Sequence, residues 1–469
     1  MAPHHFARLR GQVRLARRQG GQALIYGLFV LVGGLAALFF LFNTGQLTGE
    51  KTKLVNTADA VAYSAGVMHA RALNFEAYTN RAMMANTVAI AQLVSLSSWV
   101  SYMKNMGQFN LGAQNPKFVL FMPSYLAART TGPFVDAALN DSRLLEGLAR
   151  ASDGIVRTLS GAQQVAYLGL LPARFEVMNE VARANYQGDG EVAIDPVPLT
   201  VSEFTDFVSR RSGNDRGRFA DAVRTSADKD GFVDKRSWRM PALWSDCPTA
   251  TATLRPDWYD RRGGTELIGF DEWRAMDTLS EKRWVPKNKT DVLCRGIAET
   301  PAGWGGRAAA DDPTVDLDPT HYDSSLLVNP GPSAIAMATT QSWGYSGLPS
   351  FYELTPDALA QDDPRLRFAI RLRRDIGQTR TSEARSQIAS GERLNAYRAQ
   401  PAGGTELVAV AASEVYFRRD GPAGDNAFGA SMGKPREIGS LFNPYWQVRL
   451  VQADDQVRNA QLMQGVVMP

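Results

Sequence analysis

Three short motifs contain residue types that could do chemistry, and each departs from the pattern that its chemistry requires. Residues 62–66 (AYSAG) approximate the turn that presents a nucleophilic serine, but they lie inside a helical repeat. Residues 303–308 (GWGGRA) match a dinucleotide-binding loop loosely, with no apolar strand before them. Residues 429–434 (GASMGK) resemble a phosphate-binding loop, but Pro435 replaces the required Ser or Thr. These motifs therefore predict no enzyme and no cofactor.

A fourth motif, residues 228–234 (DKDGFVD), resembles part of a calcium-binding loop. Asp228 and Asp230 fall on ligand positions, but Ser237 stands where the loop requires a bidentate glutamate. We favour an ordinary Asp-Gly turn for this segment. The four histidines, at positions 4, 5, 69 and 321, offer no pair at helical spacing, and only the first two are neighbours. The sequence therefore predicts no metal site.

Two cysteines, Cys247 and Cys294, are the only ones in the chain. An even count in an exported region favours one disulfide, because oxidising compartments allow thiols to pair. Two buried free thiols are the alternative, since sequence does not show the distance between them.

The element that must position everything else is the apolar run of residues 23–42, which carries no charge. A helix of this length spans about 30 Å, the thickness of the hydrocarbon core of a bilayer. Arginines crowd the preceding leader, and the first acidic residue is Glu50. We predict a basic cytoplasmic leader (1–21), a transmembrane helix (22–44) in the bacterial inner membrane, and a periplasmic bulk. A cleaved secretory signal is the alternative.

Small and apolar residues predict a packing face that continues from this segment. Gly33 and Ala37 have the spacing that lets membrane helices approach closely. Apolar residues then recur every seven positions from Leu47, and alanines lie four residues after members of this row. This pattern predicts one long helix or two collinear ones over residues 22–106. Its partner is another subunit or a later helix of this chain. The face comprises Gly33, Ala37, Leu47, Leu54, Ala58, Val61, Ala65 and Met68, and the row continues through Phe75 to Leu96.

The remaining chain predicts an α+β fold. Residues 45–190 have helical character, and those after 118 could fold back on the long helix as a bundle. Residues 191–469 predict a mixed α+β region with long loops, the clearest of them at 301–332. Residues 365–373 alternate apolar side chains with arginines, which predicts a half-buried strand with a solvated arginine face. Residues 407–417 and 445–451 are further predicted strands.

The amino-terminal stretch resembles the Tad (tight adherence) family of Flp pilus-assembly proteins, the TadE/TadG-like group. The resemblance rests on residues 17–23 (RRQGGQA), the apolar span, and residues 54–62 (LVNTADAVA). Two further segments, 72–81 (ALNFEAYTNR) and 440–446 (SLFNPYW), look similar to larger Tad-like proteins, without an assigned role. The resemblance implies a pseudopilin-like or pilus-assembly protein with partners of the same apparatus. The net charge of +3 is not gathered into a basic patch, so we expect no nucleic acid partner.

Three hypotheses about function follow. The first is a non-enzymatic, membrane-anchored component of pilus assembly or of a related secretion apparatus. The second is a minor pilin that enters the filament after cleavage between Gly21 and Gln22; against it, Tyr26 stands where pilin-like proteins carry a glutamate. The third is a membrane-tethered periplasmic hydrolase or ligand-binding protein. No Asp-x-Ser-x-Ser metal motif of the kind found in some TadG-like proteins is present.

Overall fold

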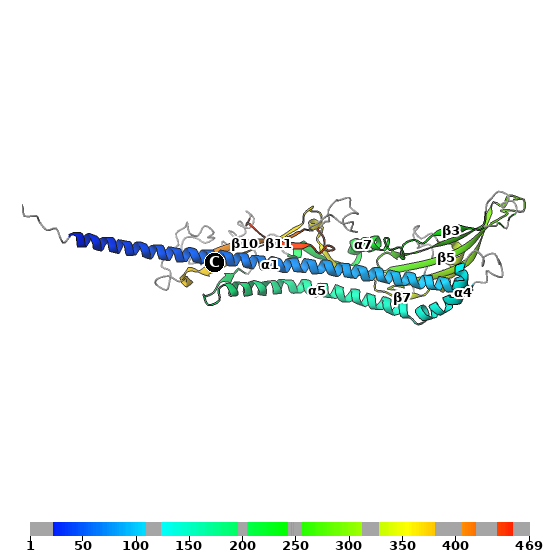
Figure 1. The fold of residues 1–469 in the computed structure, drawn as a ribbon, viewed down its shortest axis with the longest axis horizontal. Coiled ribbons are helices and arrows are strands. Elements are labelled where there is room, and N and C mark those ends of the chain that lie inside the picture. Colours follow the sequence, from blue (N-terminus) through cyan, green and yellow to red (C-terminus); the bar gives the residue numbers. More distant parts are fainter. Residues whose placement is uncertain are drawn as a thin grey trace, which may run out of the picture.

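The computed structural model describes residues 22–108, 123–195, 204–242, 245, 247, 256–311, 328–379, 406–418 and 439–453. They form an elongated molecule built along a single helix, α1 (Gln22–Gln108) (Figure 1). Long helices and several sheets together confirm the predicted α+β class.

Helix α1 has 87 residues without interruption and is about 130 Å long at 1.5 Å per residue. Asn43, Gly45 and Gly49, which could have bent it, lie within regular helix. The hydroxyl groups of Thr44 and Thr48 donate to the carbonyl oxygens four residues earlier, at 2.8 Å each. The sequence left open one long helix or two collinear ones, and the structure has a single helix.

The chain then returns along α1 as predicted. It passes through α4 (Pro123–Asp136) and a short π-helix, η1 (Ala137–Asp141), and turns at Arg143 (φ 58°) into α5 (Leu144–Asn185). Helix α5 packs against α1 along its length. Pro133 and Pro172 lie inside α4 and α5, so neither ends a helix.

A four-stranded antiparallel sheet, here called the proximal sheet, packs against α1 nearer its amino-terminal end. Val410 of β10 pairs with Arg371 of β9 in its register. The predicted strands at 365–373, 407–417 and 445–451 all belong to it and are confirmed. In spatial order the strands are β1 (Ala193–Ile194), β9 (Arg365–Asp375), β10 (Glu406–Phe417) and β11 (Trp446–Val451).

The arginine face of β9 is not simply solvated, as the alternation had predicted. Arg371 is buried and pairs with Asp195, which also accepts a hydrogen bond from Arg373. Arg365 and Arg367 pair with the buried Glu414 of the neighbouring strand, at 2.9 Å each. These arginines form ion pairs because the fold places acidic residues from distant parts of the sequence beside them.

A five-stranded sheet, here called the distal sheet, covers the carboxyl-terminal half of α1. Its strands are antiparallel except for the parallel pair β6–β7. In spatial order they are β3 (Trp238–Pro241), β4 (Trp258–Ile268), β5 (Glu272–Val285), β6 (Gly296–Ala310) and β7 (Ser342–Gly344).

The remaining elements are short. Strands β2 (Val208–Arg211) and β8 (Phe351–Leu354) pair with each other. The helical elements are α6 (Phe204–Phe207), η2 (Gly213–Arg216), α7 (Gly217–Ala227), α9 (Pro330–Thr339), α10 (Pro356–Leu359) and η4 (Ile376–Gln378).

The long loop predicted for residues 301–332 is wrong in its first part. Residues 301–310 belong to β6, and α9 begins at Pro330, while 312–327 lie outside the described residues. Composition misled the prediction, because glycine-rich sequence usually signals a loop. Here Gly303 and Gly305 lie where β6 packs closely against α1, which propensity alone does not reveal.

Candidate functional site

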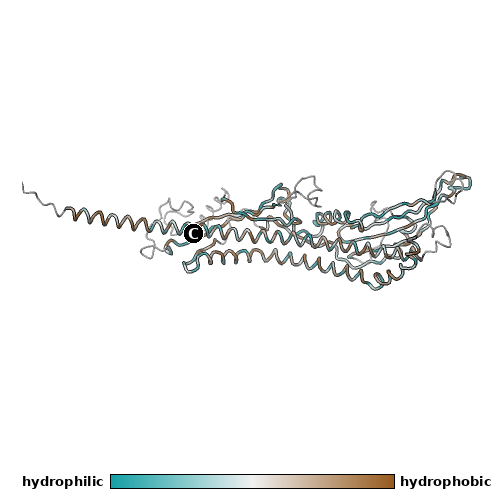
Figure 2. Tube along the Cα trace, in the orientation of Figure 1, coloured by the Kyte–Doolittle hydropathy of each residue, from teal (hydrophilic) through white to brown (hydrophobic). Residues whose placement is uncertain are grey.

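The first part of α1 projects from the folded part of the molecule as a bare apolar helix (Figure 2). The large side chains of this segment are exposed; Leu24 retains 77% of its accessible surface and Phe29 71%. The segment from Ala23 onward is the one helix among the described residues that is long and apolar enough to cross a membrane. It can therefore act only on something outside the described chain, either lipid or another protein.

The first two residues of the predicted packing face, Gly33 and Ala37, lie on this bare segment. A Cβ built at Gly33 has no heavy atom within 4 Å, and Ala37 is exposed. No other described residue packs against the Gly33 position. Gln22 is the first residue of α1, and Gly21, the other side of the predicted cleavage junction, lies outside the described residues.

The predicted packing face becomes buried at Leu47, and its partner is this chain. Leu47, Leu54 and Val61 are at most 3% exposed, as are Ala58 and Ala65. They form one core cluster with α5 and with strands β9 and β10 of the proximal sheet. The sequence left two partners open, another subunit or a later helix of this chain. For the section from Leu47 to Ala65, the partner is a later part of this chain.

The row of seven does not stay buried beyond Met68, which is itself only partly buried. Phe75, the next member, is 38% exposed, whereas Leu73 and Met83 are fully buried. Ala82, Ala89 and Leu96 are partly buried, and Leu96 packs against another core cluster. The predicted row is therefore interrupted at Phe75 and only partly buried beyond it.

The two segments noted for their likeness to larger Tad-like proteins contact each other. Asn74 of α1 donates to the carbonyl oxygen of Trp446 and accepts from its backbone N–H, both at 3.0 Å. Asn80 donates to the carbonyl oxygen of Leu441 at 2.7 Å, and Arg81 donates to Asn443 at 2.8 Å. Residues 72–81 thus hold residues 440–446 mainly by hydrogen bonds to their backbone.

A buried acid, Glu76, lies in the interface between α1 and α5. It is 1% exposed, and burial raises the pKa of its carboxyl group to about 8. Nearby, the Gln163 amide of α5 donates to the Thr79 hydroxyl at 2.7 Å and to the Asn80 side chain at 2.8 Å. At neutral pH the uncharged acid is therefore the main form.

A buried histidine lies seven residues before Glu76, about two helical turns nearer the amino terminus of α1. His69 contacts Arg174 of α5, with 3.0 Å between Nε2 and a guanidinium nitrogen, and packs on Phe204 and Phe368. Burial and then the charge of Arg174 lower the pKa of the imidazole to about 3. His69 is thus neutral over the physiological range and acts as a packed, hydrogen-bonded core residue.

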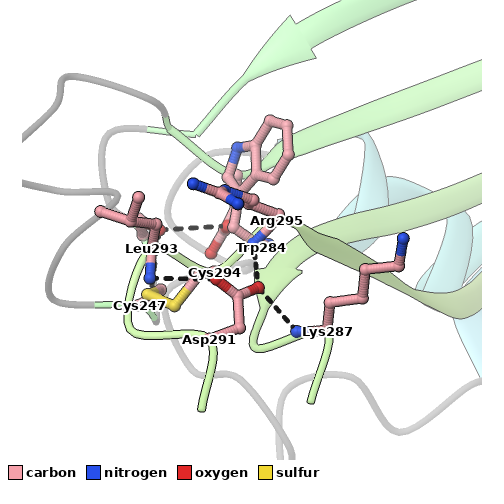
Figure 3. Close-up of a disulfide and its surroundings, with 9 residues drawn as sticks. Cys247, Trp284, Lys287, Asp291, Leu293, Cys294 and Arg295 are labelled. Carbon is pink, nitrogen blue, oxygen red and sulfur yellow. Dashed lines mark hydrogen bonds between the residues drawn. A yellow bond between two sulfur atoms is a disulfide. The ribbon is translucent and has the colours of Figure 1, made fainter.

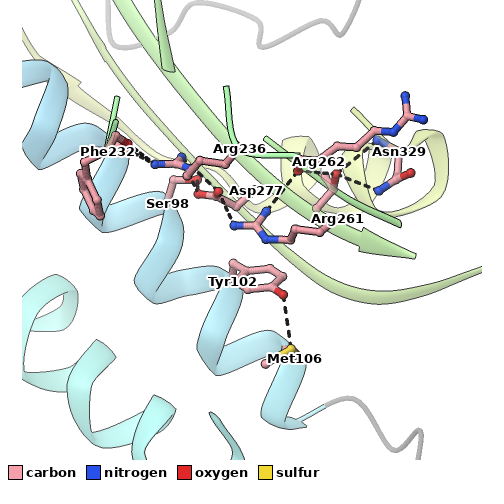
Figure 4. A network of polar contacts seen from close by, with 11 residues as sticks. Ser98, Tyr102, Met106, Phe232, Arg236, Arg261, Arg262, Asp277 and Asn329 are labelled. Carbon is pink, nitrogen blue, oxygen red and sulfur yellow. Dashed lines mark hydrogen bonds and ion pairs between the residues drawn. The ribbon is translucent and has the colours of Figure 1, made fainter. Parts of the chain in front are cut away.

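At the distal end, Asp277 of β5 joins the distal sheet to α1 (Figure 4). The Asp277 carboxylate is fully buried and accepts from the Ser98 hydroxyl and from Arg261, both at 2.7 Å. Arg236 lies 3.0 Å from the same carboxylate, and Arg261 stacks over the Tyr102 ring at 4.0 Å. Arg236 and Arg261 both pair with this buried carboxylate, and together with Ser98 they tie the distal sheet to α1.

Gly303 and Gly305 bring β6 against α1, whereas Gly306 lies against Thr340. A Cβ at Gly305 would lie 2.1 Å from the carbonyl oxygen of Ser98 and 2.5 Å from the amide nitrogen of Tyr102. Such distances are far inside van der Waals contact, so only glycine fits at this position. The motif that loosely matched a dinucleotide loop is thus a helix–strand contact. Residues 429–434 lie outside the described residues.

The other motifs are also structural. Ser64 lies inside α1, so residues 62–66 form no strand-to-helix turn. Asp230 accepts from the backbone N–H of Phe232 at 2.8 Å and from Gln92 of α1 at 2.5 Å, which lowers its pKa. It closes a turn against the long helix. Among the described residues, no three His, Cys, Asp or Glu side chains gather in a way that could hold a metal ion.

Cys247 and Cys294 are joined in a disulfide at the distal tip, with their Cα atoms 6.4 Å apart (Figure 3). The bond links the segment after β3 to the connection between β5 and β6. Asp291 shapes this connection by accepting backbone hydrogen bonds from Arg295 at 2.7 Å and Lys287 at 2.9 Å.

A comparison with known proteins gives one family match, which covers both the exposed segment of α1 and its first buried turns. Residues 21–72 match the family model Tad, described as putative Flp pilus-assembly TadE/G-like. The amino-terminal region is therefore Tad-like. This Tad-like region begins at the start of α1 and ends at Ala72, the first residue of the 72–81 segment that holds residues 440–446. No curated protein and no solved structure matches the chain.

Sequence reasoning missed the polar residues that hold the interior of the molecule together. Glu76 and Asn80 lie four positions apart, on the same buried side of α1 as Leu73 and Ala77. Polar side chains at helical spacing on an apolar face are the signal that would have found them. Nothing local to Asp277 or Gly305 gives a comparable signal, because their partners are far away in the chain.

Proposed function

We propose that this protein is a membrane-anchored, non-enzymatic structural component of a Flp/Tad-type pilus-assembly apparatus or a related secretion apparatus. The continuity of α1 carries the proposal. One helix contains a bare apolar segment of bilayer length and then becomes the spine of the folded domain. The Tad-like region, residues 21–72, spans both parts.

Continuity gives the anchor a mechanical role. No flexible linker separates the apolar segment from the domain, because α1 enters the core at Leu47 without a break. The same helix contacts α5, the proximal sheet and the distal sheet. A tilt or displacement of the membrane segment is therefore transmitted along the helix to both sheets.

The basic leader and the disulfide support one orientation of the chain in the membrane. The arginine-rich leader would remain in the cytoplasm and place the domain in the periplasm, with the apolar segment in the inner membrane. The Cys247–Cys294 disulfide suits an oxidising compartment of that kind.

A minor pilin is the second candidate. The Tad-like region includes Gly21 and Gln22, and cleavage between them would produce the mature pilin. Two observations weigh against it. Tyr26 supplies no carboxylate for a neighbouring amino terminus, and α1 is buried by its own chain from Leu47 onward. Only the first part of the helix would be free to pack in a filament.

The test is the mass and amino-terminal sequence of the full protein purified from membranes, together with pilus counts in a deletion strain. We expect an intact start at Met1, resistance to carbonate extraction, digestion by protease in spheroplasts but not in intact cells, and loss of pili on deletion. A start at Gln22 with recovery in sheared pili would establish the minor pilin. Normal piliation after deletion would refute both the minor pilin and a role in pilus assembly.

A further inference from the structure

The connection between β5 and β6, residues 286–295 and here called the tip loop, lies at the end of the molecule opposite the bare apolar segment (Figure 1). Leu279 of β5 belongs to one core cluster with Met106, which lies near the end of α1. From there β5 runs six residues further to Val285, or about 20 Å at 3.3 Å per residue. The tip loop therefore projects beyond the long helix.

Apolar side chains are exposed in the tip loop and directly behind it. Val292 is 74% exposed and Leu293 46%. Ile297, which lies opposite Trp284 in the register of β5 and β6, is 55% exposed. Trp284 itself is partly buried and packs on Trp258 of β4, with their ring centroids 5.3 Å apart. Exposed apolar residues gathered in one place mark a contact with a protein or with a membrane.

The tip loop holds these side chains in a fixed arrangement. Its Asp291 carboxylate accepts hydrogen bonds from the backbone N–H groups of Lys287 and Arg295, at 2.9 and 2.7 Å. The backbone of Leu293 donates to the same carboxylate at 3.1 Å. The disulfide of Cys294 ties the loop to the segment after β3 (Figure 3). A preformed surface of this kind loses little conformational entropy when it binds a partner.

The tip loop is also basic. Lys287, Lys289 and Arg295 are exposed, and none of them belongs to an ion pair of the described residues. Asp291 is the only acid in the loop, so three basic residues and one acid give it a net charge of +2. This excess of positive charge is available to an anionic partner.

Lysines, a tryptophan and exposed aliphatic side chains together fit a lipid surface better than a protein surface. An apolar tip surrounded by basic residues, with aromatic residues behind it, is typical of a segment that inserts among anionic lipid headgroups. Trp284 lies two residues before the tip loop, in the position of such an aromatic residue. Protein interfaces are depleted in lysine, whereas two of the three basic residues here are lysines.

We propose that the tip loop inserts into the surface of a bilayer with anionic headgroups, and that this bilayer is not the one that holds α1. The second part rests on the proposed membrane anchor. From Leu47, where α1 enters the core, to Gln108, the helix is about 90 Å long. At the tilts of up to about 40° found for membrane helices, its end stays roughly 70 Å from the anchoring bilayer. The contacted surface is then the periplasmic leaflet of the outer membrane.

Vesicle flotation with the full-length protein tests this proposal. The protein is reconstituted in nanodiscs of neutral lipid, which occupy the apolar segment, and is then mixed with vesicles. We expect it to float, with the nanodisc scaffold attached, at least tenfold more with vesicles that contain phosphatidylglycerol than with pure phosphatidylcholine vesicles. Raising the salt from 0.1 to 1 M shortens the screening length from about 10 Å to about 3 Å and should weaken this binding.

Two paired substitutions separate the apolar contribution from the basic one. Val292→Ser combined with Leu293→Ser removes the apolar tip, and Lys287→Gln combined with Lys289→Gln removes two charges. Each pair should lower binding to the anionic vesicles at least tenfold. All four side chains are exposed, so the thermal midpoint of the protein should not change.

Matched control variants carry the same changes elsewhere on the surface. Val165→Ser combined with Leu168→Ser alters two side chains of α5 that are 72% and 66% exposed. Lys229→Gln combined with Lys235→Gln removes two charges from the exposed segment after α7. Both control pairs should leave vesicle binding unchanged.

Several results would overturn the proposal. They are equal binding to neutral and anionic vesicles, undiminished binding of either tip variant, an equal loss in its matched control, and flotation without the nanodisc scaffold. In cells, a photoreactive phenylalanine analogue in place of Leu293 should crosslink to lipid. Crosslinks to a protein alone would assign the tip loop to a protein partner and refute the lipid contact.

The membrane anchor is measured separately, from co-elution of the protein with the nanodiscs before vesicles are added. Entry into nanodiscs without vesicle binding would refute the tip contact alone. Failure to enter nanodiscs would refute the anchor.

Discussion

Asn74 and Trp446, 372 residues apart, bind each other through a reciprocal pair of hydrogen bonds, each 3.0 Å long. The Asn74 side chain provides both the donor and the acceptor, and the Trp446 backbone provides their counterparts. The pair fixes the first residue of β11 on α1 and so attaches the last described strand to the long helix that opens the described chain.

We expect Asn74→Ala to destabilise the full-length protein by about 1–3 kcal/mol, because the partly buried backbone groups of Trp446 lose their partners. Denaturant titration in mild detergent, followed by near-ultraviolet circular dichroism, measures the change. Asn56→Ala, an exposed asparagine on the same helix, is the matched control and should be within about 0.5 kcal/mol of the parent. Equal effects of the two substitutions would contradict the role assigned to the pair.

Glu76 predicts a loss of stability with rising pH. Its folded pKa, about 8, lies above the ordinary value of 4.5, so the folded state binds more protons than the unfolded state between these values. Its contribution is fully present below pH 4.5 and falls by up to about 1.4 kcal/mol per pH unit as pH rises toward 8. Glu76→Gln should therefore gain stability relative to the parent between pH 5 and 8. The exposed Glu180→Gln should show no such trend.

His69 has the opposite sign. Its folded pKa, about 3, lies below the ordinary value of 6.5, so its contribution is present above pH 6.5 and decreases as pH falls toward 3. In proton spectra of the full-length protein, the His69 ring should stay neutral down to pH 5, and His69→Asn identifies its resonance. A ring that titrates near pH 6.5 would show that the imidazole is not buried as described.

Gly305→Ala should destabilise the protein by about 1–3 kcal/mol or more, because the added methyl group collides with the α1 backbone at Ser98 and Tyr102. Gly344→Ala is the matched control, a glycine of the same sheet with no heavy atom within 4 Å of its Cβ position. The difference between their denaturation midpoints is the measurement. An unchanged midpoint for Gly305→Ala would mean that β6 does not lie so close to α1.

Replacing both cysteines with serine should lower stability by up to about 4 kcal/mol on the chain-entropy account, for a sequence separation of 47 residues. The parent treated with reductant should show the same loss, which separates the bond from the substitution itself. Thiol labelling of the denatured, unreduced parent should detect no free cysteine. Reaction of both thiols under these conditions would show that the bond is absent.

The sequence was informative wherever a signal was local. An uncharged apolar run of bilayer length predicts a helix from its own composition, and residues 365–373 predict a strand from the alternation of their side chains. The leader and apolar span likewise carried the resemblance that the Tad match at residues 21–72 confirms.

Signals that depend on distant partners were lost or misread. The heptad row was predicted as one continuous seam, but the elements packed around α1 decide which of its members are buried, and Phe75 is exposed. Residues 301–310 looked like a loop because glycines usually mark turns. Here Gly305 is needed because β6 lies against the α1 backbone. Arg371 looked solvated because Asp195, its partner, is 176 residues away.

The sequence by itself thus determined the apolar helix, the main strands of the proximal sheet and the Tad-like start of the chain. Only the tertiary structure decided which side chains meet, as at Asn74 and Trp446, and which acid is kept neutral, as at Glu76. The physical reason is range. Secondary structure follows from the periodicity of neighbouring residues, whereas burial, hydrogen-bond pairing and pKa depend on groups that the fold brings together from hundreds of residues apart.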